Sequence, residues 1–110
     1  GNKKMAKKSD FSIAKLKALK FAKLVKKNMH VKRVYLFGSY AKKTNHLDSD
    51  IDIAIVSDDF SKNQMDNMLK LMRLRREIDA MIEPHPFLSK DFKKTDSLVN
   101  EIIKTGIRLV

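Results

Sequence analysis

The strongest constraint on the fold comes from the segment DSDIDIAIV, where two aspartates, Asp50 and Asp52, lead directly into an apolar run. Residues 50–56 alternate as a half-buried strand does, with the isoleucines on one face and both aspartates on the other. Strands contain few aspartates, and two carboxylates roughly 7 Å apart on one face repel each other and resist desolvation. A cation between them removes that repulsion. Mg²⁺ suits the arrangement, because proteins bind it through one or two carboxylates together with phosphate groups and water.

A glycine and a serine follow another predicted strand, VKRVYLF at residues 31–37. Gly38 allows the backbone to approach a ligand closely, and Ser39 adds a hydroxyl. The segment SYAKK is able to begin a short helix whose free N–H groups attract an anion. Lys42 and Lys43 add positive charge there, although a solvated turn is the simpler explanation of either lysine alone. We therefore predict a phosphate-binding site that faces the metal site.

The rest of the chain predicts a single small domain. With 110 residues, 43% of them hydrophobic, the chain is long enough for one core. Apolar residues at helical spacing predict helices at 10–28, 61–77 and 96–105. A third strand is predicted at 78–83, and the tail IRLV is a candidate for a fourth. The predicted fold class is α/β (α+β), with a small mixed sheet of three to four strands backed by helices.

Local signals set the predicted boundaries of these elements. Ser61 and Gln64 have the spacing of a capping box, so the second helix is expected to begin there. Pro84 and Pro86 are expected to end the third strand, because proline donates no ladder hydrogen bond. The domain is predicted to span 10–110. Residues 1–9 are expected to be a disordered basic segment or a cloning remnant, since the chain begins with Gly1 in place of a methionine. The residues expected on the buried side of the second helix are Met65, Met68, Leu69 and Met72.

The composition narrows the functional classes. The chain has 24 Lys and Arg against 13 Asp and Glu, a net charge of +11, which attracts nucleotides, RNA or an acidic protein, or else marks a solvated lysine-rich surface. Cysteine is absent, which excludes disulfides and thiolate metal sites. No apolar run approaches the length of a membrane span, and a cytoplasmic location is expected.

The two motifs together resemble a known superfamily. The pattern Gly-Ser, ten residues, Asp-x-Asp is met by Gly38, Ser39, Asp50 and Asp52, and it is the pattern of the nucleotidyltransferases that include DNA polymerase β. In length and layout, residues 10–110 are similar to the minimal nucleotidyltransferase (MNT) proteins. The resemblance implies that ATP or another NTP is the substrate. It also implies two Mg²⁺ ions, with Mn²⁺ as an alternative, and transfer of a nucleoside monophosphate to a hydroxyl with release of pyrophosphate.

The resemblance further implies a third catalytic carboxylate that binds the same metal ions and activates the hydroxyl. Two residues compete for this role, Glu83 and Asp79, which share one face of the predicted third strand. We favour Glu83, because IEPHPF resembles the point where the family's third strand ends, and keep Asp79 as the alternative. His46 and His85 are poor candidates for metal ligands, because neither has a second His or Cys at ligand spacing; His85 is close enough to Glu83 in sequence to line the site.

Several acceptors and partners are compatible with these motifs. MNT proteins typically pair with a HEPN-type toxin as its antitoxin, so the resemblance implies a protein partner, which could supply the acceptor hydroxyl. The first alternative is a non-catalytic module that binds and neutralises such a toxin, with Leu16 and Leu19 as a docking surface unless lysine stems cover them. The second is transfer to a small molecule such as an aminoglycoside. RNA binding or tRNA nucleotidyl addition is weaker, because the chain has few aromatic residues to stack bases.

Overall fold

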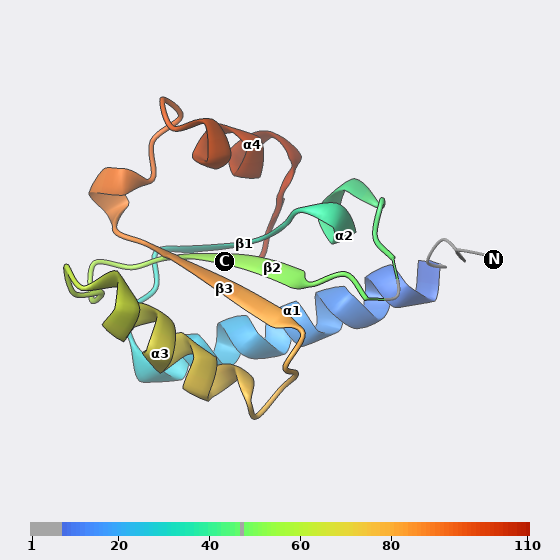
Figure 1. Cartoon of the computed structure of the whole chain (residues 1–110), viewed down its shortest axis with the longest axis horizontal. Coiled ribbons are helices and arrows are strands. Elements are labelled where there is room, and N and C mark those ends of the chain that lie inside the picture. Colours follow the sequence, from blue (N-terminus) through green and yellow to red (C-terminus); the bar gives the residue numbers. More distant parts are fainter. Residues whose placement is uncertain (1–7, 47) are drawn as a thin grey trace.

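The computed structural model describes residues 8–46 and 48–110 and contains a four-stranded sheet between helices (Figure 1). The predicted N-terminal segment 1–9 lies largely outside the described residues, and the first helix begins at Lys8. None of the described helices is both long enough and apolar enough to cross a membrane. The elements in chain order are α1 (Lys8–Asn28), β1 (Arg33–Phe37), α2 (Ser39–Lys42), β2 (Ile51–Val56), α3 (Gln64–Arg75), β3 (Ile82–Phe87), the 3-10 turn η1 (Ser89–Asp91), α4 (Ser97–Thr105) and β4 (Ile107–Arg108).

The sheet is mixed, as predicted. Its strand order is β3-β2-β1-β4, with β1 antiparallel to both β2 and β4, and β2 parallel to β3. The parallel connection from β2 to β3 passes through α3, whereas β1 and β2 are joined by the segment that contains α2. The strand β3 therefore forms one edge of the sheet, and the short β4 forms the other.

Each face of the sheet packs against different helices, because side chains alternate along a strand. Helices α1 and α3 cover one face and α4 covers the other (Figure 1). The three isoleucines of β2 pack on the first of these faces, with Phe21 of α1 and Leu71 of α3. Ala54 and Val56 pack on the opposite face with Val99 and Ile102 of α4. Asp52 of β2 shares that opposite face, beyond the part of it that α4 covers.

The prediction that the third strand occupies 78–83 and stops at the prolines was wrong. Strand β3 runs from Ile82 to Phe87 and includes Pro84 and Pro86. In a parallel pair, alternate residues direct their N–H and C=O groups to opposite sides. The carbonyl of Phe87 points toward β2 and accepts from the N–H of Ser57, the residue that follows β2. The backbone groups of the even-numbered residues point away from β2. The carbonyl of Pro86, for example, accepts from the side chain of Gln64. The backbone nitrogens of both prolines therefore point away from β2, so the missing N–H groups remove no hydrogen bond between β2 and β3.

The predicted start of α3 was also wrong. The helix begins at Gln64 with Asn63 as its N-cap, whose side chain accepts a hydrogen bond from the N–H of Asp66. Ser61 is engaged elsewhere, since its N–H donates to Oδ1 of Asn67. Asn67 and Leu71 are the buried residues of this helix. Of the residues predicted to be buried on this helix, Met65 and Leu69 are exposed, and Met68 and Met72 are half-buried.

Candidate active site

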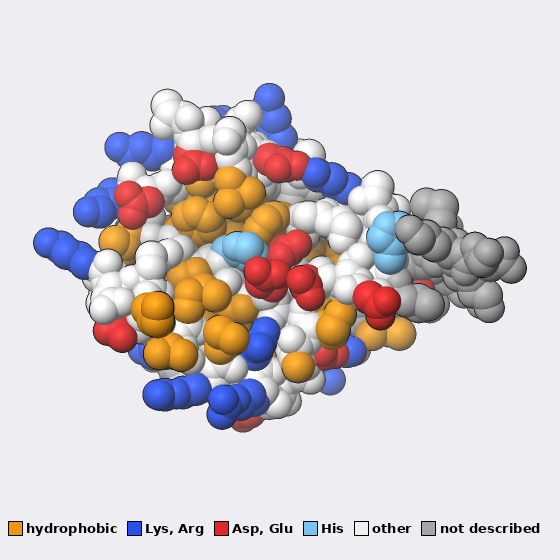
Figure 2. Space-filling view, in the orientation of Figure 1, with side chains coloured by type: hydrophobic (Ala, Val, Ile, Leu, Met, Phe, Trp, Pro, Cys, Tyr) orange, Lys and Arg blue, Asp and Glu red, His pale blue; other side chains and the backbone are white. Residues whose placement is uncertain are grey.

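The register of the sheet gathers the acidic side chains. Asp52 pairs with Phe37 at the end of β1 and with Glu83 on β3, so the side chains of Asp52 and Glu83 lie side by side on the α4 face. Asp50 immediately precedes β2 and is exposed, whereas Asp52 is half-buried. Figure 2 shows acidic side chains gathered in the middle of one face of the molecule, with a histidine beside them. Asp50, Asp52 and Glu83, predicted to act together, are therefore neighbours.

Gly38 follows β1 directly and makes a close contact with this acidic group. Its φ of 74° lies in the region that side chains disfavour. A Cβ at this position would lie 2.4 Å from Oδ2 of Asp52. Helix α2 begins at Ser39, and the carbonyl of Gly38 accepts from the N–H of Lys42. Glycine is required here, because its missing side chain leaves the space that the carboxylate of Asp52 occupies.

Glu83 is held among the other carboxylates. The pKa of its carboxyl is raised, first by desolvation, then by its hydrogen bond with Asp50 and by the nearby charge of Asp52, while His85 acts in the opposite direction. A raised pKa indicates that a negative charge on Glu83 is disfavoured when no cation is present. The arrangement therefore has the chemistry of a cation site, in which hard carboxylate oxygens converge and a divalent ion relieves their repulsion.

His85 is a part of this site that the sequence did not establish. Its Nε2 atom lies 3.1 Å from Oδ1 of Asp52, and its ring contacts that of Phe37 edge to face, with centroids 4.8 Å apart. One ligand atom each from Asp52, Glu83 and His85 lie within 4.8 Å of one another. The sequence did contain a signal for this position. His85 follows Glu83 by two residues, so the two side chains share one face once the strand continues through Pro84.

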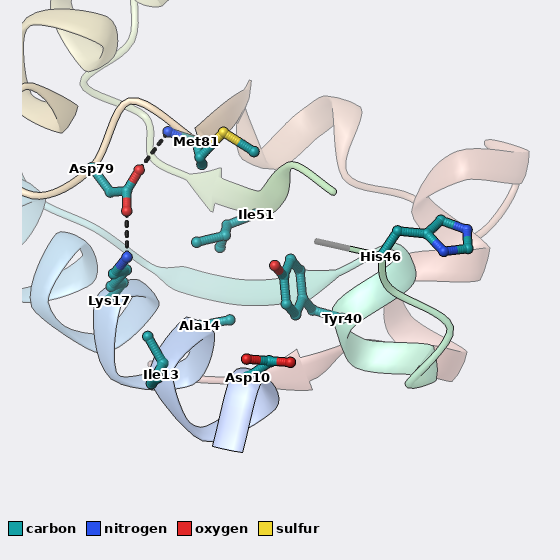
Figure 3. Close-up of a pocket in the computed structure, with 9 residues that line it drawn as sticks. All are labelled: Asp10, Ile13, Ala14, Lys17, Tyr40, His46, Ile51, Asp79 and Met81. Atoms are coloured by element: carbon teal, nitrogen blue, oxygen red, sulfur yellow. Dashed lines mark hydrogen bonds and ion pairs between the residues drawn. The ribbon is translucent and has the colours of Figure 1, made fainter. Parts of the chain in front are cut away.

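Asp79, the alternative third carboxylate, lies elsewhere. It forms an ion pair with Lys17 of α1 and accepts a hydrogen bond of 2.7 Å from the N–H of Met81 (Figure 3). The bond to Lys17 is the larger cause that lowers the pKa of Asp79, and the bond to Met81 is the second. Lys17, Asp79 and Met81 line a cavity of about 190 Å³ on the α1 side of the sheet, together with Tyr40 and Ile51. The structure thus groups Glu83, and not Asp79, with Asp50 and Asp52.

The predicted phosphate-binding lysines have partners of their own. Lys42 forms an ion pair with Glu101 of α4. Lys43 has a left-handed backbone conformation, and its ammonium nitrogen lies 5.4 Å from the centre of the Phe11 ring. Phosphate binding by Lys42 and Lys43 stays a prediction. His46 lies with Tyr40 at the cavity on the α1 side, and its N–H donates to the hydroxyl of Ser49.

A family model supplies the deciding comparison: the model described as "Polymerase beta, Nucleotidyltransferase" matches residues 19–110. The chain belongs to this nucleotidyltransferase family. The superfamily inferred from Gly38, Ser39, Asp50 and Asp52 is thereby confirmed. No curated protein sequence matches this nucleotidyltransferase domain.

Solved structures of toxin–antitoxin pairs are similar to this nucleotidyltransferase domain. One is the crystal structure of a toxin–antitoxin with AMP-PNP, at 26% identity and a TM-score of 0.62, covering 83% of this chain and 70% of that chain. A second is an MntA-HpeT mutant in which two aspartates are replaced by glutamates, at 26% identity and a TM-score of 0.60, covering 83% and 70%. A third structure, of an MntA-HpeT mutant with a tyrosine replaced by alanine, has 28% identity and a TM-score of 0.60, covering 83% and 69%. The similarity to MNT antitoxins is thus confirmed.

Proposed function

We propose that this nucleotidyltransferase domain transfers AMP from ATP to a hydroxyl with the help of divalent metal ions, Mg²⁺ or Mn²⁺. The observation that carries the proposal is the convergence of Asp50, Asp52 and Glu83 beside Gly38, on the open end of one sheet face. The carboxylates fit a divalent cation, because they supply several hard oxygen ligands at one point. Bound metal ions would stabilise the attacking and leaving oxygens of the phosphoryl group.

Each residue of the site has its own role in the proposed transfer. Asp50, Asp52 and Glu83 would hold the metal ions, and Gly38 and Ser39 would receive the phosphates beside them. Lys42 and Lys43 follow in sequence and add positive charge near this end of the sheet. In the transfer, the acceptor oxygen forms a bond to the α-phosphorus, the bond from that phosphorus to the pyrophosphate oxygen breaks, and the hydroxyl proton passes to the carboxylate of Glu83.

The acceptor in this proposal is a side-chain hydroxyl of a partner protein, and the chain is the antitoxin of a HEPN/MNT-type pair. The support is that the similar solved structures are those of toxin–antitoxin pairs, one of them with AMP-PNP and one with two aspartates replaced. A protein acceptor also suits the open site, since the side chains of Asp50 and Glu83 are exposed. A tyrosine of the toxin would be blocked by the transferred AMP.

A second candidate function, partner binding without catalysis, is favoured by apolar side chains on α1. Leu16 is 53% exposed and Leu19 41% exposed, so the lysine stems of the helix do not bury them. An exposed apolar row between lysines is suited to a protein surface with complementary apolar and acidic groups. The two candidates share the partner and differ in whether the acidic site is needed.

ATP binding with and without Mg²⁺ or Mn²⁺ tests the proposal, using calorimetry on the wild type and on Asp50→Ala/Asp52→Ala. A matched control is Asp66→Ala/Glu77→Ala, which removes two exposed acidic groups from α3 and the turn after it. Metal-dependent binding that is lost only in the first double variant supports the proposal. Transfer of labelled AMP to the co-purified product of a neighbouring gene separates the enzyme from the binding module. A domain that binds no nucleotide, alone or with that partner, would contradict the catalytic proposal.

A further inference from the structure

The histidine of the acidic site is placed as a metal ligand would be. The side chains of His85 and Asp52 are 28% and 24% exposed, so both are accessible but held in position. The edge-to-face contact with Phe37 at an interplanar angle of 65° sets the direction of the imidazole ring. Its Nε2 atom is then directed at Asp52, on the strand that carries the predicted metal-binding aspartates.

Three ligand atoms of two chemical kinds meet at this point. Within residues 8–46 and 48–110, the set of Asp52, Glu83 and His85 is the one group of three His, Asp or Glu side chains close enough to hold a metal ion together, with all ligand atoms within 4.8 Å. Two ligands at right angles on an ion at a distance of about 2.1 Å are themselves about 3.0 Å apart. The 3.1 Å between Nε2 of His85 and Oδ1 of Asp52 matches such a pair. Glu83 is exposed and has a long side chain with rotatable bonds, so a change of its hydrogen bond with Asp50 would let its carboxylate close the remaining gap.

We propose that Nε2 of His85 is a ligand of the metal centre, so that the site formed by Asp52, Glu83 and His85 takes a first-row transition ion, Mn²⁺, in preference to Mg²⁺. An all-carboxylate site suits Mg²⁺, whereas an imidazole nitrogen favours transition ions, which bind nitrogen more strongly. The inference deepens the proposed function by naming the metal of that same site, and it rests on that function only for the position of the centre. Metal binding in the absence of nucleotide tests it.

A different role for His85 makes a different prediction. As a positioning residue, His85 would orient Asp52 by a hydrogen bond and would never touch the ion. Its loss would then weaken the binding of every ion through Asp52, by a similar factor for Mg²⁺ and Mn²⁺. As a ligand, His85 would contribute far more to the affinity for Mn²⁺ than to that for Mg²⁺. The difference between the two ions, and not the loss itself, separates the roles.

The experiment measures free Mn²⁺ by electron paramagnetic resonance as the full chain is titrated, followed by displacement of bound Mn²⁺ with Mg²⁺. The variants are His85→Gln and, as a matched control, His30→Gln, because Nδ1 of His30 lies 3.2 Å from Oδ2 of Asp59 in an exposed pair outside the site. We expect His85→Gln to weaken Mn²⁺ binding by about tenfold or more and Mg²⁺ binding by less than about threefold, and His30→Gln to change neither.

Two results would overturn the proposal: an equal loss for both ions in His85→Gln, or a wild type that binds no Mn²⁺. Circular dichroism of each variant checks that it folds. A second measurement needs no variant: nitrogen-15 spectra of the imidazoles during addition of Mn²⁺ should show the signals of His85 broadened first, with those of His30 and His46 as internal references. Broadening of all three together would contradict a specific site. Neither measurement involves ATP or an acceptor, so a failure of nucleotidyl transfer would leave its outcome unaffected.

Discussion

The carboxylate of Asp52 occupies the space that a side chain at position 38 would need. A Cβ on Gly38 would lie 2.4 Å from Oδ2 of Asp52 and 3.3 Å from its Cγ. The glycine ends β1 and the aspartate lies on β2, so the contact joins the two halves of the sequence motif. It explains in steric terms why a glycine at position 38 accompanies an aspartate at position 52.

We predict that Gly38→Ala destabilises the fold by more than about 1 kcal/mol, because the new Cβ meets the carboxylate and the positive φ is strained. Urea unfolding measures the change. In the background of Asp52→Ala the same substitution should cost less, since the two nearest atoms are gone and only the backbone strain is left. Equal costs in both backgrounds would show that Asp52 is not the group that requires the glycine.

Substitutions of the two candidate third carboxylates should have opposite effects. Glu83→Gln should weaken Mn²⁺ binding by about tenfold or more and leave stability nearly unchanged, because it removes a ligand and a repelled charge together. Asp79→Asn should leave Mn²⁺ binding unchanged and lower stability by roughly 0.5–1 kcal/mol, because it weakens the half-exposed ion pair with Lys17. Metal titration and urea unfolding of both variants would reveal the reverse pattern if Asp79 were the catalytic residue.

Asp58 should make stability depend on pH in the acid range. Its hydrogen bond with Lys32 is the largest cause, and its bonds with Ser89 the next, that lower its pKa from 3.8 to about 2. A carboxyl whose pKa is lower in the folded state contributes stability above its unfolded pKa and loses it as the pH falls toward the folded pKa. Wild type should therefore exceed Asp58→Asn in stability at pH 6, and urea unfolding at lower pH should show that difference shrinking below about pH 4. A difference that grows on acidification would contradict this sign.

Leu16 should be dispensable for folding and required for the partner. We expect Leu16→Ser to change stability by less than about 0.5 kcal/mol, because the side chain is half exposed. Leu69→Ser on α3 is a matched control, since Leu69 is 48% exposed on a different helix. In pull-down assays with the co-expressed partner, Leu16→Ser should reduce recovery and Leu69→Ser should not. Equal recovery of both variants would place the docking surface away from this part of α1.

The sequence was sufficient where the signals are local. The alternation of Ile51 and Asp52 assigns two faces to β2, and the helical spacing in α1 and α4 predicts their positions. The strand-ending glycine and the two aspartates fix the centre of the candidate site, because both belong to strands that become neighbours. These parts needed no knowledge of how distant segments pair.

The errors arose where a long-range relation decides the structure. Prolines end an interior strand but are tolerated on an edge strand, and nothing local shows that β3 lies at the edge of the sheet. The same error left His85 as a residue that only lines the site, because its side chain joins the site face only if the strand continues past Pro84. The partner of Lys42 was also beyond local sequence signals, because Glu101 lies on a helix 59 residues away; phosphate binding by Lys42 stays a prediction.

The two prolines of β3 also restrict the backbone of the unfolded chain. Each fixes its own φ near −65° and biases the residue before it toward extended conformations. In the segment Glu83–Pro84–His85–Pro86, every residue is therefore either a proline or followed by one. The strand that carries two of the site's side chains is already largely extended in the unfolded ensemble, so ordering it loses little conformational entropy. The site gains rigidity from its own covalent structure and depends less on its neighbours to hold Glu83 and His85 on one face.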